Sequence, residues 1–103
     1  MSIIPGSKFP NEYIVISAHL DAHGTHDGKI YNGADDDGSG NVSILEIAES
    51  FAIAVKDGHP PKRSIIFLHV TAEEKGLIGS KYYVDNPLYP LKNTIANLNI
   101  DMI

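Results

Sequence analysis

The spacing of apolar residues changes along the chain, and each change predicts a different element. Residues 12–18 (EYIVISA) and 63–71 (RSIIFLHVT) are rich in β-branched residues and almost continuously apolar. Such runs are typical of strands that are buried on both faces. From Val42 onward, apolar residues recur every three or four positions, which predicts a helix that buries one face. This helix should end near Gly58, because two prolines follow and prevent its continuation.

The second half of the chain continues this alternation. Residues 76–87 (GLIGSKYYVDNP) predict a shorter helix that ends before Pro87, and residues 94–103 (TIANLNIDMI) become a third strand. The predicted order is therefore strand, helix, strand, helix, strand. Strands that alternate with helices pair in parallel through right-handed crossovers. We predict an α/β fold with a mainly parallel sheet and flanking helices.

Composition narrows the class of protein further. The chain has 103 residues, of which 43% are hydrophobic and 20% charged, as in ordinary globular domains. A net charge of −5 disfavours nucleic acid and anionic membranes as partners, and the absence of cysteine excludes thiol chemistry. No apolar run is long enough to cross a bilayer. The last predicted strand runs to Ile103, so we expect residues 1–103 to form a single partial domain.

Polar side chains follow each of the three predicted strands. His19 and Asp21 follow the first, Glu73 and Glu74 the second, and Asp101 the third. The carboxyl ends of parallel strands meet at one edge of the sheet, where ligands bind. The run of three aspartates in NGADDDGSGN, residues 32–41, lies in the loop that leads into the first helix. We therefore expect these acids and one histidine to converge.

Converging carboxylates need a positive charge, because like charges and burial both disfavour the ionised form. Lys75 is the one basic residue within these motifs. A divalent cation is the simplest alternative, and one imidazole with several carboxylates suits zinc, although manganese and cobalt also accept such donors. Two metals that share a bridging carboxylate would use the surplus acids and leave one glutamate free as a general base.

Four motifs, taken together, resemble a known family. AHLD, GADDDGSG, AEEKGLIGS and NIDM occur in the order found in the co-catalytic, two-zinc aminopeptidases of metallopeptidase clan MH. That clan includes leucyl aminopeptidases and glutamate-carboxypeptidase relatives. The resemblance implies a zinc-exopeptidase fold of the phosphorylase/hydrolase-like type, of which the chain holds an N-terminal part. It also favours a secreted or periplasmic protein.

The resemblance implies a metal role for four residues. His19 and Asp101 would be ligands of the first zinc. Asp36, the middle of the three aspartates, would bridge both zinc ions, and Glu74 would be a ligand of the second.

Two further residues receive catalytic roles from the same resemblance. Glu73 would be the general base that deprotonates the bridging water, and Asp21 would orient the ring of His19. The family also implies a cis peptide bond between Asp36 and Asp37.

One feature of the family is missing. Its second zinc has a histidine ligand well downstream of the third strand, and this chain ends at Ile103. The expectation is a parent enzyme that removes N-terminal residues from peptides, and a chain that is inactive or nearly so by itself. His23 and His26 are read as solvated loop residues, and His69 as a core histidine.

Other functions also remain open. Part of the aspartate loop matches a calcium-binding EF-hand pattern, but no helical period precedes it. A non-catalytic relative would have no use for Glu73. Within the clan, a carboxypeptidase or a glutaminyl cyclase also fits the motifs. The residues of the calcium pattern are Asp35, Asp37, Ser39, Gly40 and Glu46.

Overall fold

The computed structural model describes residues 1–103 and has a four-stranded mixed sheet at its centre. The strand order is β1 (Ser2–Ile4), β5 (Arg63–Val70), β2 (Phe9–His19) and β6 (Thr94–Asn99). Both β5 and β6 pair with β2 in parallel, and β1 pairs with β5 antiparallel. The three predicted strands and their parallel pairing are confirmed, and the fold is α/β.

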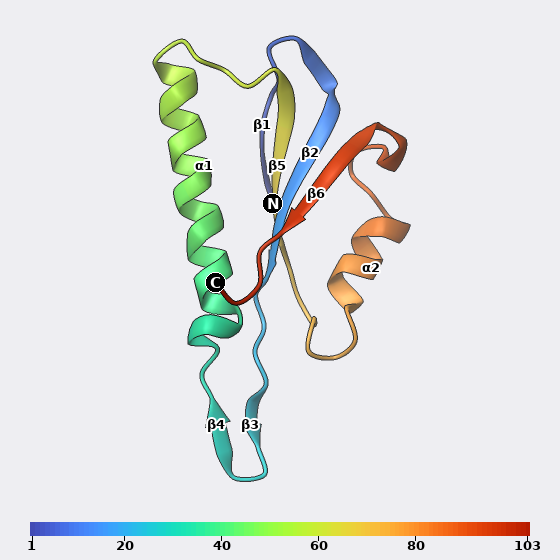
Figure 1. Cartoon of the computed structure of the whole chain (residues 1–103). Coiled ribbons are helices and arrows are strands. Elements are labelled where there is room, and N and C mark those ends of the chain that lie inside the picture. Colours follow the sequence, from blue (N-terminus) through green and yellow to red (C-terminus); the bar gives the residue numbers. More distant parts are fainter.

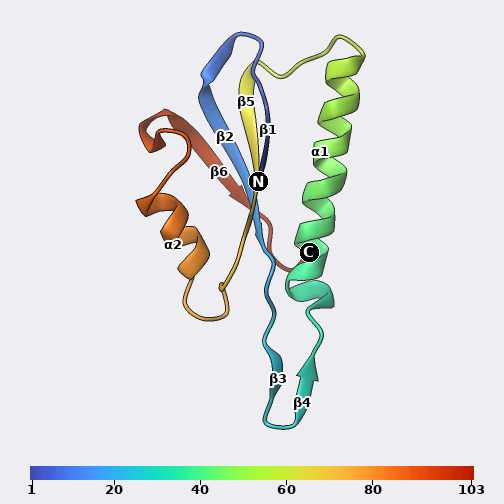
Figure 2. The same ribbon diagram turned by 180° about the vertical axis from the view of Figure 1, so that it is seen from behind.

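The two helices cover opposite faces of this sheet (Figures 1 and 2). On one face, α1 (Gly40–Lys56) runs along β2 and β5, whereas α2 (Ile78–Asp85) lies on the other face beside β6. A turn at Ala34–Ser39, in which the backbone of Asp36 and Asp37 is not helical, leads into α1. A short 3-10 turn at Leu91–Asn93 precedes β6. Neither α1 nor α2 combines the length and the apolar character that a membrane-spanning helix requires.

Two small apolar clusters hold the layers together. Alternate residues of a strand point to opposite faces of a sheet, so neighbours in β2 and β5 enter different clusters. Ile44 of α1 is fully buried and packs with residues of β2 and β5 on the α1 side. Tyr13, Val15 and Ile66 form the cluster on the α2 side. The partners of Ile44 are Ile16, Ala18, Ile65 and Phe67.

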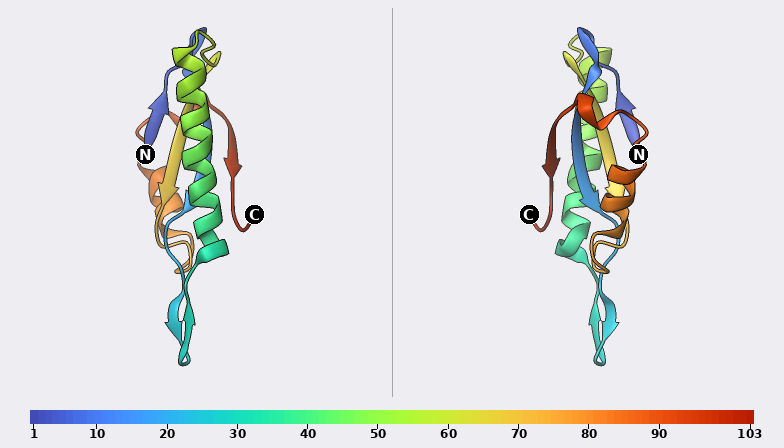
Figure 3. Two further views of the ribbon diagram at one scale, coloured as in Figure 1. Left: turned by 90° about the vertical axis from the view of Figure 1, so that its left-hand side faces the viewer. Right: turned by 90° about the vertical axis from the view of Figure 1, so that its right-hand side faces the viewer.

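Two features were not predicted from the sequence. One is β1, which has only three residues and therefore gives no periodic signal. The other is a hairpin of β3 (Gly24–His26) and β4 (Lys29–Tyr31), which projects beyond the sheet (Figures 1 and 3). All six strand residues of the hairpin are exposed, so their side chains carry no pattern of burial. The third strand also ends at Asn99, earlier than predicted, and Asp101 lies in the segment after it.

Candidate metal centre

Three parallel strands bring the predicted site residues to one edge of the sheet. His19 is the last residue of β2, the two glutamates follow β5, and Asp101 follows β6. Asp36 lies in the turn before α1. Residues that are more than eighty positions apart in the chain are therefore neighbours in space.

The imidazole of His19 is buried and faces two carboxylates. Its Nδ1–H donates to the main-chain carbonyl of Asp21 at 3.0 Å, which leaves the lone pair of the neutral ring on Nε2. Nε2 lies 3.1 Å from Asp36 Oδ1 and 4.0 Å from Asp101 Oδ1. Nevertheless, it is buried without a hydrogen-bond partner, because the approach of Asp36 does not have hydrogen-bond geometry. An orphaned, inward-facing nitrogen among carboxylates fits a metal ion.

A second group of donors lies beside the first. Atoms of His23, Asp36 and Glu74 approach one another within 4.8 Å. The side chain of Glu74 is only 8% exposed, and its Oε1 is buried without a partner. His23 lies in a loop with a side chain that is 51% exposed, as predicted, but its Nε2 also lies 2.9 Å from Glu74 Oε2, a contact that the sequence did not indicate. His26 does point outward, with a side chain that is 75% exposed.

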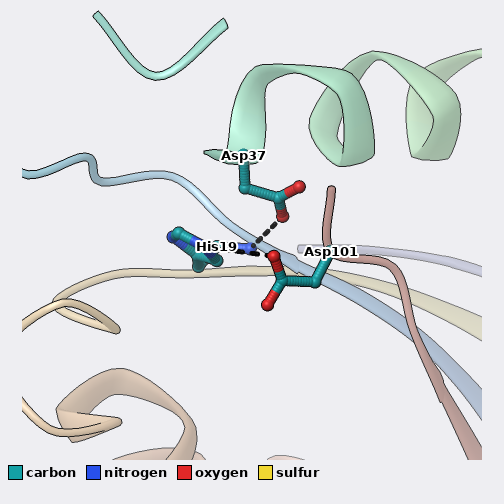
Figure 4. Close-up of side chains that lie close together, drawn as sticks. All are labelled: His19, Asp37 and Asp101. Carbon is teal, nitrogen blue, oxygen red and sulfur yellow. Dashed lines mark hydrogen bonds and ion pairs between the residues drawn. The ribbon is translucent and has the colours of Figure 1, made fainter. Parts of the chain in front are cut away.

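Asp37 has a different role from Asp36, although the two are adjacent. Asp37 is almost fully buried, and Figure 4 shows its carboxylate beside His19 and Asp101. Oδ2 accepts a hydrogen bond from the backbone N–H of His19 at 3.1 Å, and Oδ1 accepts from the N–H groups of Gly40 and Met102 at 3.2 and 3.3 Å. Both oxygens are therefore occupied by the main chain. The peptide bond between Asp36 and Asp37 is cis, as the resemblance implied.

Asp21 fixes the loop that carries the two glutamates. Its carboxylate oxygens accept hydrogen bonds from the N–H groups of Glu73 and Glu74 at 2.9 and 3.1 Å. Burial by itself would raise the pKa of Asp21, but these N–H donors and the nearby His19 outweigh burial and lower the pKa. The carboxylate lies 3.6 Å from Nδ1 of His19, farther than the carbonyl of the same residue. Its contacts with the glutamate loop are thus the closer ones.

The carboxylates also shift the titration of His19. Burial lowers the pKa of His19, but the charges of Asp37, Glu73 and Asp101 and the carbonyl of Asp21 outweigh burial and raise the pKa above 6.5. The site therefore favours a positive charge at the position of this ring. A divalent cation beside the ring would meet this demand.

Asn41 is a site residue to which sequence reasoning assigned no role in the site. From the first turn of α1, its side-chain NH2 donates to the carbonyl of His19 and to that of Asp37 at 2.8 Å. Its Oδ1 lies 2.6 Å from Nδ1 of His69, so this ring nitrogen is the donor. Asn41 therefore joins β2, β5 and α1 beneath the carboxylates. Nothing in the sequence distinguishes it from an ordinary helix-cap residue.

Two hollows open on either side of the donors. One, of about 380 Å³, is lined by His19, Glu73 and Asp101, and it extends between the sheet and α2. The other, of about 210 Å³, is lined by Asp36, Glu74 and residues of the hairpin. Glu73 thus faces the first hollow and Glu74 the second, while Asp36 reaches the His19 ring as well.

These observations define a class of protein: an α/β protein with candidate metal positions at the carboxyl edge of parallel strands. Residues 1–103 match peptidase family M28, and the chain belongs to this family. The match agrees with the resemblance to the co-catalytic zinc peptidases.

Individual relatives cover most of the chain. It is 37% identical over 100 residues to the probable glutamate carboxypeptidase VP8 of Zea mays, which covers 96% of the chain and 13% of that protein. It is 36% identical over 104 residues to aminopeptidase NAALADL1 of Mus musculus, and this match covers 99% of the chain and 13% of that protein. A vacuolar membrane protease of Verticillium alfalfae is 36% identical over 85 residues, and this match covers 82% of the chain and 8% of that protein. The chain thus spans about an eighth of the length of the first two relatives.

Proposed function

We propose that the chain carries most of the metal centre of a zinc-dependent aminopeptidase. The observation that carries this proposal is the buried, unpartnered Nε2 of His19, which faces the carboxylates of Asp36 and Asp101. These three residues would hold one zinc ion. Glu74 and a second oxygen of Asp36 would hold another. We further propose that residues 1–103 are one part of a larger catalytic domain, since the relatives are much longer.

The chain's own residues divide the remaining work. Zinc, when bound, supplies Lewis acidity that activates a water molecule and polarises the scissile carbonyl. Glu73 lines the same hollow as His19 and Asp101, so its carboxylate is placed to accept the proton of the attacking water. The same carboxylic acid then delivers this proton to the leaving amine. The carboxylate of Asp21 positions Glu73, because it accepts a hydrogen bond from the backbone N–H of Glu73.

The charge around the site favours an amino terminus over a carboxyl terminus. Neither hollow is lined by a lysine or an arginine that could pair with a substrate carboxylate. Both hollows are lined by acids, which attract a cationic α-amino group. A glutamate carboxypeptidase is the second candidate, since relatives carry that name. It would need a cationic group from elsewhere to bind the substrate's carboxylates.

The calcium-binding alternative receives no support from the geometry. The loop is preceded by a β-hairpin and not by a helix, and both oxygens of Asp37 accept backbone N–H groups. A glutaminyl cyclase and a non-catalytic relative remain outcomes of the test below.

The test combines zinc binding with hydrolysis. We expect the zinc-loaded full-length protein to cleave a peptide with a free amino terminus, and to spare the same peptide when it is N-acetylated. Glu73→Gln should keep zinc affinity within about twofold and lower kcat by about 100-fold or more, because only the base is lost. Glu46→Gln, on the exposed face of α1, is the matched control. Cleavage by Glu73→Gln at the normal rate would refute the assignment of the base.

A further inference from the structure

Asn41 and His69 form a hydrogen-bonded pair beneath the candidate metal centre. Asn41 lies in the first turn of α1, and His69 is the last residue but one of β5. Asn41 Oδ1 lies 2.6 Å from His69 Nδ1, and His69 belongs to neither group of candidate metal donors. We propose that this pair positions the ligands of the zinc centre: His69 orients the side-chain amide of Asn41, and the amide holds the backbone beside His19 and Asp36 in place. This inference rests on the proposed zinc centre, to which it adds two positioning residues.

The NH2 group of Asn41 connects two backbone segments that carry proposed ligands. It donates to the carbonyl of His19, the last residue of β2, and to the carbonyl of Asp37 at 2.8 Å. Asp37 directly follows Asp36, and the backbone of both residues is not helical, so side-chain contacts such as this one help to define its course. Asn41 thereby links the end of β2 to the turn that carries the proposed bridging carboxylate.

The partners of the amide dictate which way it faces. A carbonyl oxygen only accepts hydrogen bonds, so the NH2 group has to face His19 and Asp37, and Oδ1 has to face His69. Nδ1 of His69 is therefore the donor, and the neutral ring keeps its lone pair on Nε2. The other tautomer would place a lone pair against Oδ1, and two acceptors at this distance repel each other. His69 thus favours the one orientation of the amide that serves both carbonyls.

The donor atoms of His19 and Asp36 are already close to the spacing that zinc requires. His19 Nε2 lies 3.1 Å from Asp36 Oδ1. Two ligands that are about 2.0–2.2 Å from a tetrahedral zinc lie about 3.4 Å apart. Groups that hold metal ligands in place contribute about 10–100-fold to metal affinity. Asn41 contacts the main chain of one ligand and the residue next to the other, so its loss should let the two donor atoms move apart and weaken zinc binding.

Zinc affinity of the full-length protein, measured by competition with a chelator, tests the proposal. We expect Asn41→Ala to weaken zinc binding by about tenfold and His69→Ala by about threefold to tenfold, the lower part of the range for groups that orient ligands. His69→Asn should stay within about twofold of the wild type, because its amide nitrogen can donate to Asn41 in place of Nδ1. Ser43→Ala is the matched control. It removes a hydrogen bond of 2.8 Å to the carbonyl of Ser39 in the same part of α1, so it should leave the affinity unchanged.

Two further measurements separate positioning from a merely structural role. If His69 acts through Asn41, the double variant Asn41→Ala with His69→Ala should bind zinc as tightly as Asn41→Ala alone. In the metal-free wild type at about pH 8, the ¹⁵N resonances of His69 should show a protonated Nδ1 and an unprotonated Nε2. Asn41→Ala should shift the ring toward the other tautomer. A structural contact would lower the free energy of unfolding in urea but leave the zinc affinity of the folded protein unchanged.

The outcomes distinguish this inference from the proposed zinc centre. If the wild type binds zinc tightly and Asn41→Ala and His69→Ala bind it equally tightly, the inference is wrong and the zinc centre stands. Equal losses in Asn41→Ala and Ser43→Ala would also overturn it. If Asn41→Ala does not fold, the His69 variants decide, because they keep the amide: wild-type affinity in His69→Ala, or no recovery in His69→Asn, contradicts the inference. If the wild type does not bind zinc, the zinc centre fails and the inference fails with it.

Discussion

The carboxylate of Asp37 accepts a hydrogen bond from the backbone N–H of His19 at 3.1 Å, and so ties the end of β2 to the turn before α1. The same carboxylate accepts from Gly40 in α1 and from Met102 after β6. One buried side chain therefore joins three segments that carry candidate ligands. This relationship explains how a loop between two elements can hold Asp36 beside the His19 ring.

Replacement of Asp37 should destabilise the protein. Asp37→Ala removes the acceptor of the His19 and Met102 N–H groups, while the N–H of Gly40 keeps the main-chain carbonyl of residue 37. Each buried orphan costs about 1–3 kcal/mol, less where water enters. We expect the free energy of unfolding, measured by urea denaturation, to fall by roughly 3 kcal/mol. Asp35→Ala is the control, because Asp35 is exposed and should change stability by less than about 0.5 kcal/mol. Equal effects of the two substitutions would contradict the role given to Asp37.

Gly40 is required because of its contact with the same carboxylate. A Cβ at this position would lie 2.7 Å from Asp37 Oδ2 and 2.7 Å from the carbonyl oxygen of Ile100. In an open helix, Gly→Ala stabilises by about 1 kcal/mol. Here we expect Gly40→Ala to destabilise by about 1–3 kcal/mol, as is usual for overpacking in a buried site. Ser50→Ala, at an exposed position of α1, should be nearly neutral in the same urea experiment. Stabilisation by Gly40→Ala would mean that the turn is not packed as described.

The shifted pKa values of two histidines should make the stability of the metal-free protein depend on pH. The pKa of His19 is raised above 6.5 in the folded protein. Its contribution to the free energy of unfolding is therefore fully present below pH 6.5 and is lost as pH rises through the folded-state pKa. Burial, followed by the charge of the N-terminus, lowers the pKa of His69, so its contribution is present above pH 6.5 and is lost as pH falls through the folded-state pKa. Stability between pH 5 and pH 8.5 should therefore peak at roughly pH 6.5.

Urea unfolding in the presence of a chelator measures this profile. His69→Gln should flatten the acid side, whereas His59→Gln, at an exposed position, should leave the profile unchanged. Saturating zinc should reverse the slope on the alkaline side, because only the neutral form of His19 binds a metal. A profile that rises steadily with pH in the chelator would show that His19 is not held in its charged form.

The sequence predicted the elements that bury an apolar face, and these elements position most of the site. Residues 12–18 and 63–71 became β2 and β5, and their parallel pairing placed His19 next to the loop of Glu73 and Glu74. The resemblance, and not the spacing of residues, separated Asp36 from Asp37. The two residues are identical and adjacent, so the pattern of residues does not indicate which carboxylate turns toward the His19 ring.

The features that were missed depend on contacts rather than on pattern. His23 looked like an ordinary loop residue because its hairpin is exposed, and only the fold brings it to Glu74. The glutamate loop also contains Ala72 and Leu77 with positive φ, at 55° and 59°. Non-glycine residues rarely adopt this conformation, so no propensity would predict it. Hydrogen bonds from this loop to Asp21 hold it there.

Asp36 should affect both metal positions, whereas Asp101 should affect only one. Asp36 Oδ1 lies 3.1 Å from His19 Nε2, and Asp36 also belongs to the donor group of His23 and Glu74. Asp101 lies 4.0 Å from His19 Nε2 and belongs only to the donor group of His19 and Asp37. We therefore expect Asp36→Ala to weaken both zinc ions in calorimetry by about tenfold or more, and Asp101→Ala to weaken one. Asp36→Asn keeps the size of the side chain but removes its charge, and should give an intermediate loss at both positions. Loss of a single ion in Asp36→Ala would show that its carboxylate serves one metal, in which case the two donor groups are independent sites.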